Sequence, residues 1–220
     1  MKRIPEPELM NDPAQAHAYA HADFATPHQL FIETFQGKFP ELKINDVVLD
    51  LGCGPCDVSR RFARTYLQCS IHAVDGANNM LSHAKSFNQQ HGLEQRIRLI
   101  EGLLPAVNLP QRFYQTIISN SLLHHLHNPF VLWETILQYA KPFATIFIMD
   151  LMRPNSEDEA QELQERYSAN EPEVLQQDFY HSLLAAFTPA EVQQQLDQMS
   201  ISTLQIDIIS DRHMIIYGRL

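Results

Sequence analysis

The stretch Val47-Val-Leu-Asp-Leu-Gly-Cys-Gly-Pro-Cys-Asp57 decides how this chain folds. Its first three residues form an apolar, largely β-branched run that is typical of a strand buried on both faces, and Asp50 stands where that strand leaves the sheet. Gly52 and Gly54 lack the Cβ atoms that would block a tight turn or the close approach of a ligand. We therefore expect a strand that ends in a glycine turn.

An amphipathic helix is expected directly after this turn. Val58, Phe62 and Tyr66 recur at every fourth position, so they lie on one face of a helix that packs back onto the sheet. Such an arrangement aims a helix N-terminus and free backbone amides at a small molecule. The turn is therefore the first place to look for a ligand.

Two other motifs overlap this stretch. A dinucleotide site of the Gly-x-Gly-x-x-Gly kind needs a glycine at position 57, where this chain has Asp57, whose carboxylate would repel a pyrophosphate. Cys53-Gly-Pro-Cys56 has the spacing of a redox-active dithiol at a helix start, although two small residues in a tight turn explain it equally simply. Asp50, placed before the glycines, favours a ligand with a cationic end.

Asp50-x-Gly52-x-Gly54 resembles motif I of the class I S-adenosylmethionine (SAM)-dependent methyltransferases, in which the acidic residue helps to hold the methionine moiety. Where the family often has another small residue, commonly glycine, this chain has Cys56. The resemblance implies SAM as cofactor and S-adenosylhomocysteine (SAH) as product. The residues that it places against the cofactor here are Asp50, Leu51, Gly52, Cys53 and Gly54.

A second acidic residue follows the next expected strand, 70–75. Asp75 lies 25 residues after Asp50, near the interval of about 20 residues between a glycine turn and a ribose-binding carboxylate. It can accept hydrogen bonds from both ribose hydroxyls, and Gly76 leaves room for the nucleoside. The resemblance implies that Met80 packs on the adenine, while an ordinary core position is the alternative.

The residues after the third expected strand, 97–101, differ from the family pattern. Gly102, Leu103 and Leu104 stand where related enzymes usually have Gly-Asp-Ala, whose aspartate contacts the adenine amino group. Because that carboxylate is absent, adenine recognition falls to backbone groups of Leu103 and Leu104.

The fourth expected strand, 116–120, is followed by Ser121-Leu-Leu-His-His-Leu-His-Asn-Pro129. This text is similar to the segment after the fourth strand in small-molecule methyltransferases, including the ubiquinone and menaquinone branch. Asn120 and Ser121 are expected at the cofactor, because ligands bind at the carboxyl ends of parallel strands. His124 and His125 are candidate proton acceptors. Their spacing is poor for metal binding, so we expect no metal ion here.

The outer segments are predicted to form a helical cap. We expect a helical cap segment over residues 1–46, a SAM-binding domain over 47–220 and a helical cap insertion at about 155–187. Tyr19, on an expected N-terminal helix, is a candidate to close the cofactor site. Arg153, Tyr180 and His181 are the candidates for substrate contact, and Tyr180 and His181 are also candidate proton acceptors.

A fifth buried strand is expected at 144–150. Two further strands, 204–209 and 213–218, are separated by Ser-Asp-Arg and read as a terminal hairpin. The sequence therefore predicts an α/β fold: a Rossmann-like, seven-stranded, mostly parallel sheet with a C-terminal antiparallel hairpin and a helical cap.

The composition limits the class of partner. In 220 residues, 16 Lys and Arg face 26 Asp and Glu, which gives a formal charge of -10. Such a surface repels phosphate backbones, so we expect no nucleic-acid substrate. No signal peptide or bilayer-crossing run is expected, and three cysteines without framework spacing indicate a reducing compartment, the cytoplasm.

The sequence thus predicts a SAM-dependent methyltransferase that acts on an oxygen, nitrogen or carbon atom of a small-molecule acceptor. Two alternatives stay open: a non-catalytic SAM-binding partner or regulatory protein, and a tRNA or protein methyltransferase. The oligomeric state and the identity of the acceptor are also open.

Overall fold

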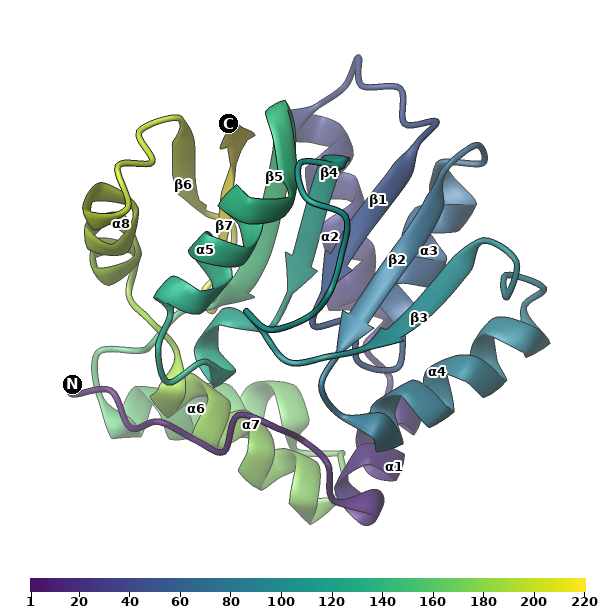
Figure 1. Cartoon of the computed structure of the whole chain (residues 1–220). Helices are drawn as coiled ribbons and strands as arrows, with labels where there is room; N and C mark the ends of the chain where they lie inside the picture. The colour runs from purple at the N-terminus through teal and green to yellow at the C-terminus, as the bar shows by residue number, and fades with distance from the viewer.

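A seven-stranded sheet forms the centre of the computed structural model, which describes residues 1–220 (Figure 1). The strand order is β3-β2-β1-β4-β5-β7-β6, and only β7 runs antiparallel to its neighbours. The strands are β1 (Val47–Leu51), β2 (Ser70–Asp75), β3 (Ile97–Glu101), β4 (Tyr114–Asn120), β5 (Ala140–Leu151), β6 (Leu204–Ile208) and β7 (His213–Arg219). The predicted fold class is confirmed.

Helices cover both faces of this sheet. One face carries α2 (Ala25–Lys38), α3 (Asp57–Thr65) and α4 (Asn78–Gln90), and the other carries α5 (Phe130–Tyr139) and α8 (Pro189–Gln198). Successive strand residues point to opposite faces, so Val48 packs in one core and Leu49 in the other. This explains why the central strands read as continuous apolar runs.

The predicted strand ends differ from the structure where pairing extends a strand. β4 begins at Tyr114, two residues before the expected start, because Tyr114 pairs with Ala140. β5 likewise begins at Ala140, four residues before the expected start at 144, and therefore includes Lys141 and Pro142. The register shifts beyond Tyr114, so this proline lies in an irregular part of the ladder, where its missing N–H is tolerated.

A third layer, the cap, lies beyond the carboxyl ends of the parallel strands (Figure 1). It consists of α1 (Pro13–His21), α6 (Glu157–Ser168), α7 (Glu173–Ala185) and an extended N-terminal segment, residues 1–12, which we call the strap. Leu163, Leu183 and Leu184 give α6 and α7 a small core of their own. No helix of the chain has both the length and the apolar character that crossing a bilayer would require.

Hydrogen bonds fasten the strap to the rest of the molecule. The Arg3 guanidinium donates to the carbonyl oxygens of His124 at 2.8 Å and Leu126 at 3.0 Å, and the Ile4 N–H donates to the carbonyl of Leu184 at 3.0 Å. The strap therefore joins the segment after β4 to α7 and runs across the carboxyl edge of the sheet (Figure 1).

Candidate functional site

Two adjoining cavities open at the carboxyl edge of the sheet. The first, which we call the glycine-turn cavity, is lined by nearly all of the residues that the sequence placed against a cofactor: Tyr19, Asp50, Gly52, Cys53, Gly54, Asp75, Gly76, Met80, Gly102, Leu103, Leu104, Asn120 and Ser121. Leu51 is the exception. Its side chain is fully buried in the core of the sheet and does not line the cavity, because it points away from the site at the end of β1.

Glycine is present at positions 52 and 54 of the turn for different physical reasons. Gly52 has a φ of +72°, and a Cβ there would lie 2.8 Å from Leu122 Cδ1. Gly54 has a φ of +50°, and no atom lies within 4 Å of the position of its missing Cβ. Gly52 therefore lets the turn pack, whereas Gly54 leaves open space beside the cavity.

Asp75 is held by the turn that it faces. Its Oδ2 accepts a hydrogen bond from Gly54 N at 2.8 Å, and its Oδ1 accepts one from Ala77 N at 2.8 Å. Burial raises the pKa of Asp75, although these backbone donors oppose the shift. Each oxygen keeps a further lone pair, so the carboxyl group can still accept hydrogen bonds from a ligand.

Asp50 is buried at the end of β1, where its Oδ2 accepts a hydrogen bond from Ser59 Oγ. Burial raises the pKa of Asp50 to about 7, and the Asp75 charge adds to this shift while Ser59 opposes it. A cationic group in the cavity would favour the ionised carboxylate. Asp50 is thus suited to a positively charged ligand.

The cysteine pair is buried in the same turn. Cys53 and Cys56 are both free thiols, and burial raises the pKa of the Cys53 thiol well above its ordinary value, helped by a hydrogen bond with Cys56. A reactive dithiol needs a lowered pKa and solvent access. Since neither condition holds at Cys53, packing in a tight turn accounts for the pair.

Apolar side chains form the far wall of the glycine-turn cavity. Met80 is 3% exposed, lines the cavity and packs with Ala16 and Ala77. It therefore fits both the adenine-contact reading and the core reading. Leu103 is 55% exposed, and a Cβ on Gly76 would lie 2.6 Å from Leu103 Cδ2. Gly76 thus leaves the room that the Leu103 side chain occupies.

The second cavity, which we call the cap cavity, lies between the sheet edge and the cap. It has a volume of about 370 Å³ and is lined by residues of α1, α2, α6, α7 and β7 as well as the segment after β4. Both cavities share a set of lining residues: Met10, Tyr19, His28, Asn120, Ser121 and His125. A ligand in one cavity can therefore meet a ligand in the other.

His124 is one of the polar groups of the cap cavity. Its Nδ1 lies 2.6 Å from Asp150 Oδ1, and Leu123 N donates to Asp150 Oδ2 at 2.8 Å. Burial opposes the charged imidazolium, but the Asp150 carboxylate outweighs it, so the pKa of His124 is raised. Because Asp150 holds the Nδ1 proton, the lone pair of His124 is left on Nε2.

Glu6 of the strap meets both histidines. Its Oε1 lies 3.7 Å from His124 Nε2 and 3.2 Å from His125 Nδ1, and Ser182 Oγ donates to it at 3.0 Å. Burial raises the pKa of Glu6, although His124 opposes the shift. A proton shared among Glu6, His124 and His125 relieves the repulsion between their lone pairs. These three side chains also have the spacing of a metal-binding group, although no metal ion was expected here from the sequence.

Three buried polar atoms around the cap cavity have no hydrogen-bond partner. They are Asn120 Oδ1, Asp178 Oδ2 and His125 Nδ1, the last of which faces Glu6 Oε1 at 3.2 Å without a hydrogen bond to it. The pKa of His125 is well below its ordinary value because of burial and the neighbouring His124. Unpaired buried polar atoms are costly, so each of these atoms indicates a place where a ligand can bond.

The predicted substrate residues are placed differently from expectation. Tyr180 is half-buried against the small core of the cap, and His181 is exposed; neither lines a cavity. On the helix α7, Asp178, Phe179 and Ser182 face the cap cavity instead. The helix was located correctly, but the face that it turns inward was not.

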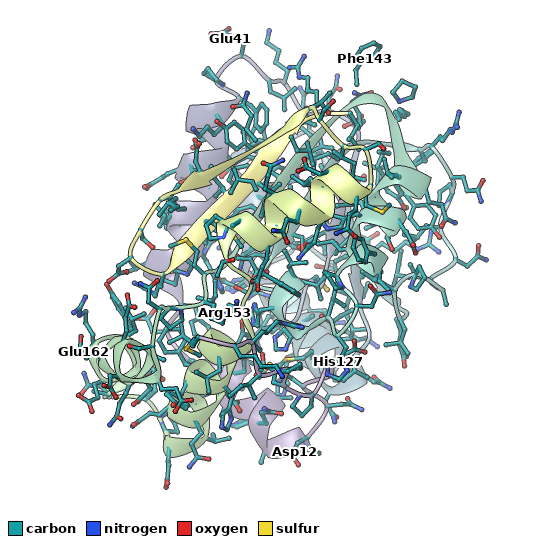
Figure 2. The ribbon with its side chains drawn as sticks, turned by 90° about the vertical axis from the view of Figure 1, so that its left-hand side faces the viewer. Asp12, Glu41, His127, Phe143, Arg153 and Glu162 are labelled. Carbon is teal, nitrogen blue, oxygen red and sulfur yellow. The ribbon has the colours of Figure 1, made fainter.

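Arg153 is also outside both cavities. Its side chain is 6% exposed, and its Nη2 lies 2.6 Å from Glu191 Oε1 while its Nη1 donates to the Ala186 carbonyl at 3.0 Å. Figure 2 shows Arg153 between α8 and the cap helices. Arg153 therefore joins the cap to α8 and lines neither cavity.

Several lining residues are not predicted from the sequence, among them residues of the strap and of α2. Leu9 and Met10 line the glycine-turn cavity, and so does His28, whose Nδ1 lies 2.8 Å from Asp57 Oδ2. This bond and that from Arg61 outweigh burial and lower the pKa of Asp57. Nothing local marks these positions, because contacts across such long sequence distances leave no periodic pattern.

A family model and several solved structures are similar to this chain. Residues 48–143 match the family model of a methyltransferase domain. No curated protein matches the chain. Among solved structures, a SAM-dependent methyltransferase from Aquifex aeolicus is 18% identical, with a TM-score of 0.67 over 94% of this chain and 98% of that chain.

Two further structures are similar over nearly the whole chain. A proposed SAM-dependent methyltransferase from Methanococcus maripaludis is 18% identical, with a TM-score of 0.73 over 98% of this chain and 96% of that chain. The plantazolicin methyltransferase BpumL in complex with SAH is 17% identical, with a TM-score of 0.72 over 94% of this chain and 91% of that chain. At these identities the similarity shows the fold.

Proposed function

We propose that this chain, a methyltransferase with the class I fold, transfers the methyl group of SAM to an oxygen, nitrogen or carbon atom of a small-molecule acceptor. SAM occupies the glycine-turn cavity, and the acceptor occupies the cap cavity. The observation that carries this proposal is the shared wall: residues such as Asn120, Ser121 and His125 line both cavities, so the two molecules meet there.

The residues of the glycine-turn cavity fit SAM. Asp75 keeps lone pairs that can accept hydrogen bonds from the two ribose hydroxyls, and the Asp50 carboxylate attracts the positively charged methionine end. Met80 and Leu103 supply apolar surface for the adenine. Neighbouring structures with SAH or SAM bound support the same assignment.

When bound, SAM supplies an electrophilic methyl group on a sulfonium sulfur. The protein therefore has to orient the acceptor and exclude water, and orientation alone can supply up to roughly 7–11 kcal/mol in favourable cases. Met10 of the strap and Tyr19 of α1 line both cavities, where the two ligands would meet. They close the site against solvent.

An acceptor hydroxyl or amine must also lose a proton. His124 is the residue best placed to take it, because Asp150 fixes its tautomer and raises its pKa. His125 is the second candidate; its pKa is lowered by burial, and its Nδ1 lies 3.2 Å from Glu6 Oε1. Asp150 acts through His124 and is a positioning residue.

The acceptor is expected to be small and to carry hydrogen-bond donors. The cap cavity, at about 370 Å³, lies at the lower end of the range of roughly 300–1,000 Å³ for small-molecule sites. Its unpaired atoms on Asn120, His125 and Asp178 can each accept a hydrogen bond. A compact polar molecule with N–H or O–H groups satisfies them.

Calorimetry followed by a transfer assay tests this proposal. We expect pure protein to bind SAH with micromolar affinity and to move radiolabelled methyl groups from SAM to members of a panel of compact amines and alcohols. A matched panel in which the donors are O- or N-methylated should give no product. Failure to bind SAH or SAM would remove the proposal.

The transfer assay also separates the alternatives. SAH binding without turnover on any compact acceptor would favour a non-catalytic SAM-binding protein. Steeply salt-dependent binding of tRNA would favour a nucleic-acid substrate, against the formal charge of -10.

A further inference from the structure

We propose that His17, His21 and His83 form a binding site for a borderline divalent cation such as Zn²⁺, which clasps α1 to α4. The site lies outside both cavities, and none of its residues has a role in the proposed methyl transfer. The proposed metal site therefore does not depend on the proposed methyl transfer.

The geometry brings three imidazoles together from two helices. His17 and His21 are four residues apart on α1, so they share one face, and their ring centroids lie 4.2 Å apart. His83 reaches them from α4, with centroid distances of 5.6 Å to His17 and 5.5 Å to His21. Figure 1 shows α1 beside α4.

The donor atoms are close to the spacing that a metal ion needs. One ring nitrogen from each histidine lies within 4.8 Å of the others. Nitrogens that bind the same tetrahedral Zn²⁺ at 2.0–2.1 Å lie about 3.4 Å apart. His17 and His21 are exposed and His83 is half-buried, so small side-chain rotations close this gap.

One ligand is already oriented as metal-binding histidines are. His21 Nδ1 lies 2.8 Å from the His17 carbonyl oxygen, to which it can donate its proton. This contact puts the lone pair on Nε2, and a ring N–H bonded to a backbone carbonyl is the usual outer support of a metal ligand.

The chemistry of the group selects the kind of ion. All three donor atoms are imidazole nitrogens. Phe87 packs beside His21 and His83 and adds no oxygen ligand. An imidazole-only set suits Zn²⁺, Co²⁺, Ni²⁺ or Cu²⁺, not Mg²⁺ or Ca²⁺.

The clasp would act on an element that covers the glycine-turn cavity. Between α1 and α4, Ala16 packs with Ala77 and Met80, and Tyr19 lies against this small cluster. A bound ion would add a second fastening to this apolar contact at the outer end of the two helices. Opening of α1 would then become rarer.

Metal titration of the tag-free, chelator-treated protein tests the proposal. We expect one equivalent of Zn²⁺ to bind in calorimetry, and Co²⁺ to give the intense visible absorption of a tetrahedral site. His83→Ala and His17→Ala should each weaken Zn²⁺ binding at least tenfold. The matched control is His91→Ala, an exposed histidine after the same helix, which should bind as the unaltered protein does.

Hydrogen exchange tests the clasp itself. Zn²⁺ should slow amide exchange in α1 of the unaltered protein and leave it unchanged in His83→Ala. Equal Zn²⁺ affinity in His83→Ala and the unaltered protein would overturn the proposal. The proposal would also be overturned if Zn²⁺ still bound a variant in which His17, His21 and His83 are all replaced by Ala but did not bind His125→Ala. The ion would then belong to the group of Glu6, His124 and His125.

Discussion

The two cavities are built in different ways. Most residues that line the glycine-turn cavity follow the ends of β1 to β4 closely in sequence. Most residues that line the cap cavity come from α1, α2, α6, α7, β7 and the loops beside them, which tertiary packing brings together. The first keeps the geometry of the sheet, and the second can be rebuilt without disturbing it.

Their hydrogen bonding shows the same contrast. Asp50 and Asp75 in the glycine-turn cavity are held by internal donors from Ser59, Gly54 and Ala77. The cap cavity instead keeps acceptors without partners, such as Asp178 Oδ2. The polar groups of the glycine-turn cavity are thus held in place before a ligand binds, whereas some of those in the cap cavity can form hydrogen bonds only when a ligand is bound. Substitutions in each cavity test this difference.

Asp75→Ala should cause the largest loss. It removes two hydrogen bonds from ribose to a charged group, each worth about 1.5–3 kcal/mol, so SAH affinity should fall by at least about 100-fold. Calorimetry measures this change. Asp197→Ala, on the exposed side of α8, is the control and should shift the affinity less than twofold. Near-normal SAH binding by Asp75→Ala would break the assignment of the glycine-turn cavity.

Asp178→Asn should impair acceptor methylation without impairing SAH binding. We expect kcat/KM for the acceptor to fall on the order of 30-fold, because a hydrogen bond to a charged group is lost, while SAH affinity stays within twofold. Gln177→Ala, its exposed neighbour on α7, should leave both quantities unchanged. A parallel loss of SAH affinity would show that the cavities are not independent.

The pKa of Asp50 makes SAM binding depend on pH. In the ligand-free protein its carboxyl titrates at about 7, whereas the cationic ligand favours the ionised form. Binding therefore releases a proton, and SAM affinity should rise about tenfold between pH 5.5 and 7. Calorimetry in buffers of different ionisation enthalpy measures the released proton. Asp50→Asn should bind more weakly, with no such pH dependence.

The same group has an effect on stability with a defined sign. Its folded-state pKa of about 7 exceeds the unfolded value of about 3.9, so the folded state holds a proton that the unfolded chain releases. The free energy of unfolding should therefore decrease as pH rises from about 4 to 7. Urea titrations should show that Asp50→Asn lacks this contribution. An identical slope in both proteins would contradict the assigned pKa.

Cys56→Ala should have the smallest effect. Cys56 is fully buried, so removal of its sulfur should lower the free energy of unfolding by about 1 kcal/mol, while SAM affinity and turnover stay within twofold. Denaturant unfolding and the transfer assay measure the two quantities. A loss of turnover beyond tenfold would revive a chemical role for the thiol pair.

Much of the first cavity could be predicted, because its residues are marked by local patterns. Asp50 and Asp75 follow apolar strands, and Gly52 and Gly54 follow Asp50 at fixed spacing. Leu51 was misplaced because a spacing rule does not say which way a side chain points. At the segment after β4, Asn120 and Ser121 were found by the same strand-end argument.

The second cavity was predicted only in outline. The helix containing Tyr180 and His181 was located, but Asp178 and Phe179 line the cavity instead, since the inward face of a helix with apolar residues on several sides is set by what it packs against. Glu6 was not found at all. Its contact with His124 spans 118 residues and depends on the path of the strap, which carries no periodic signal.

By itself, the sequence determined the order of strands and helices, the glycine turn and the two acidic strand ends, because propensity, periodicity and turn chemistry act over a few neighbouring residues. Only the tertiary structure decided which side chains face the cap cavity, that Asp150 holds His124, and that His83 meets His17 and His21. These pairings depend on burial and packing between distant segments, whose energies appear only when the chain is folded.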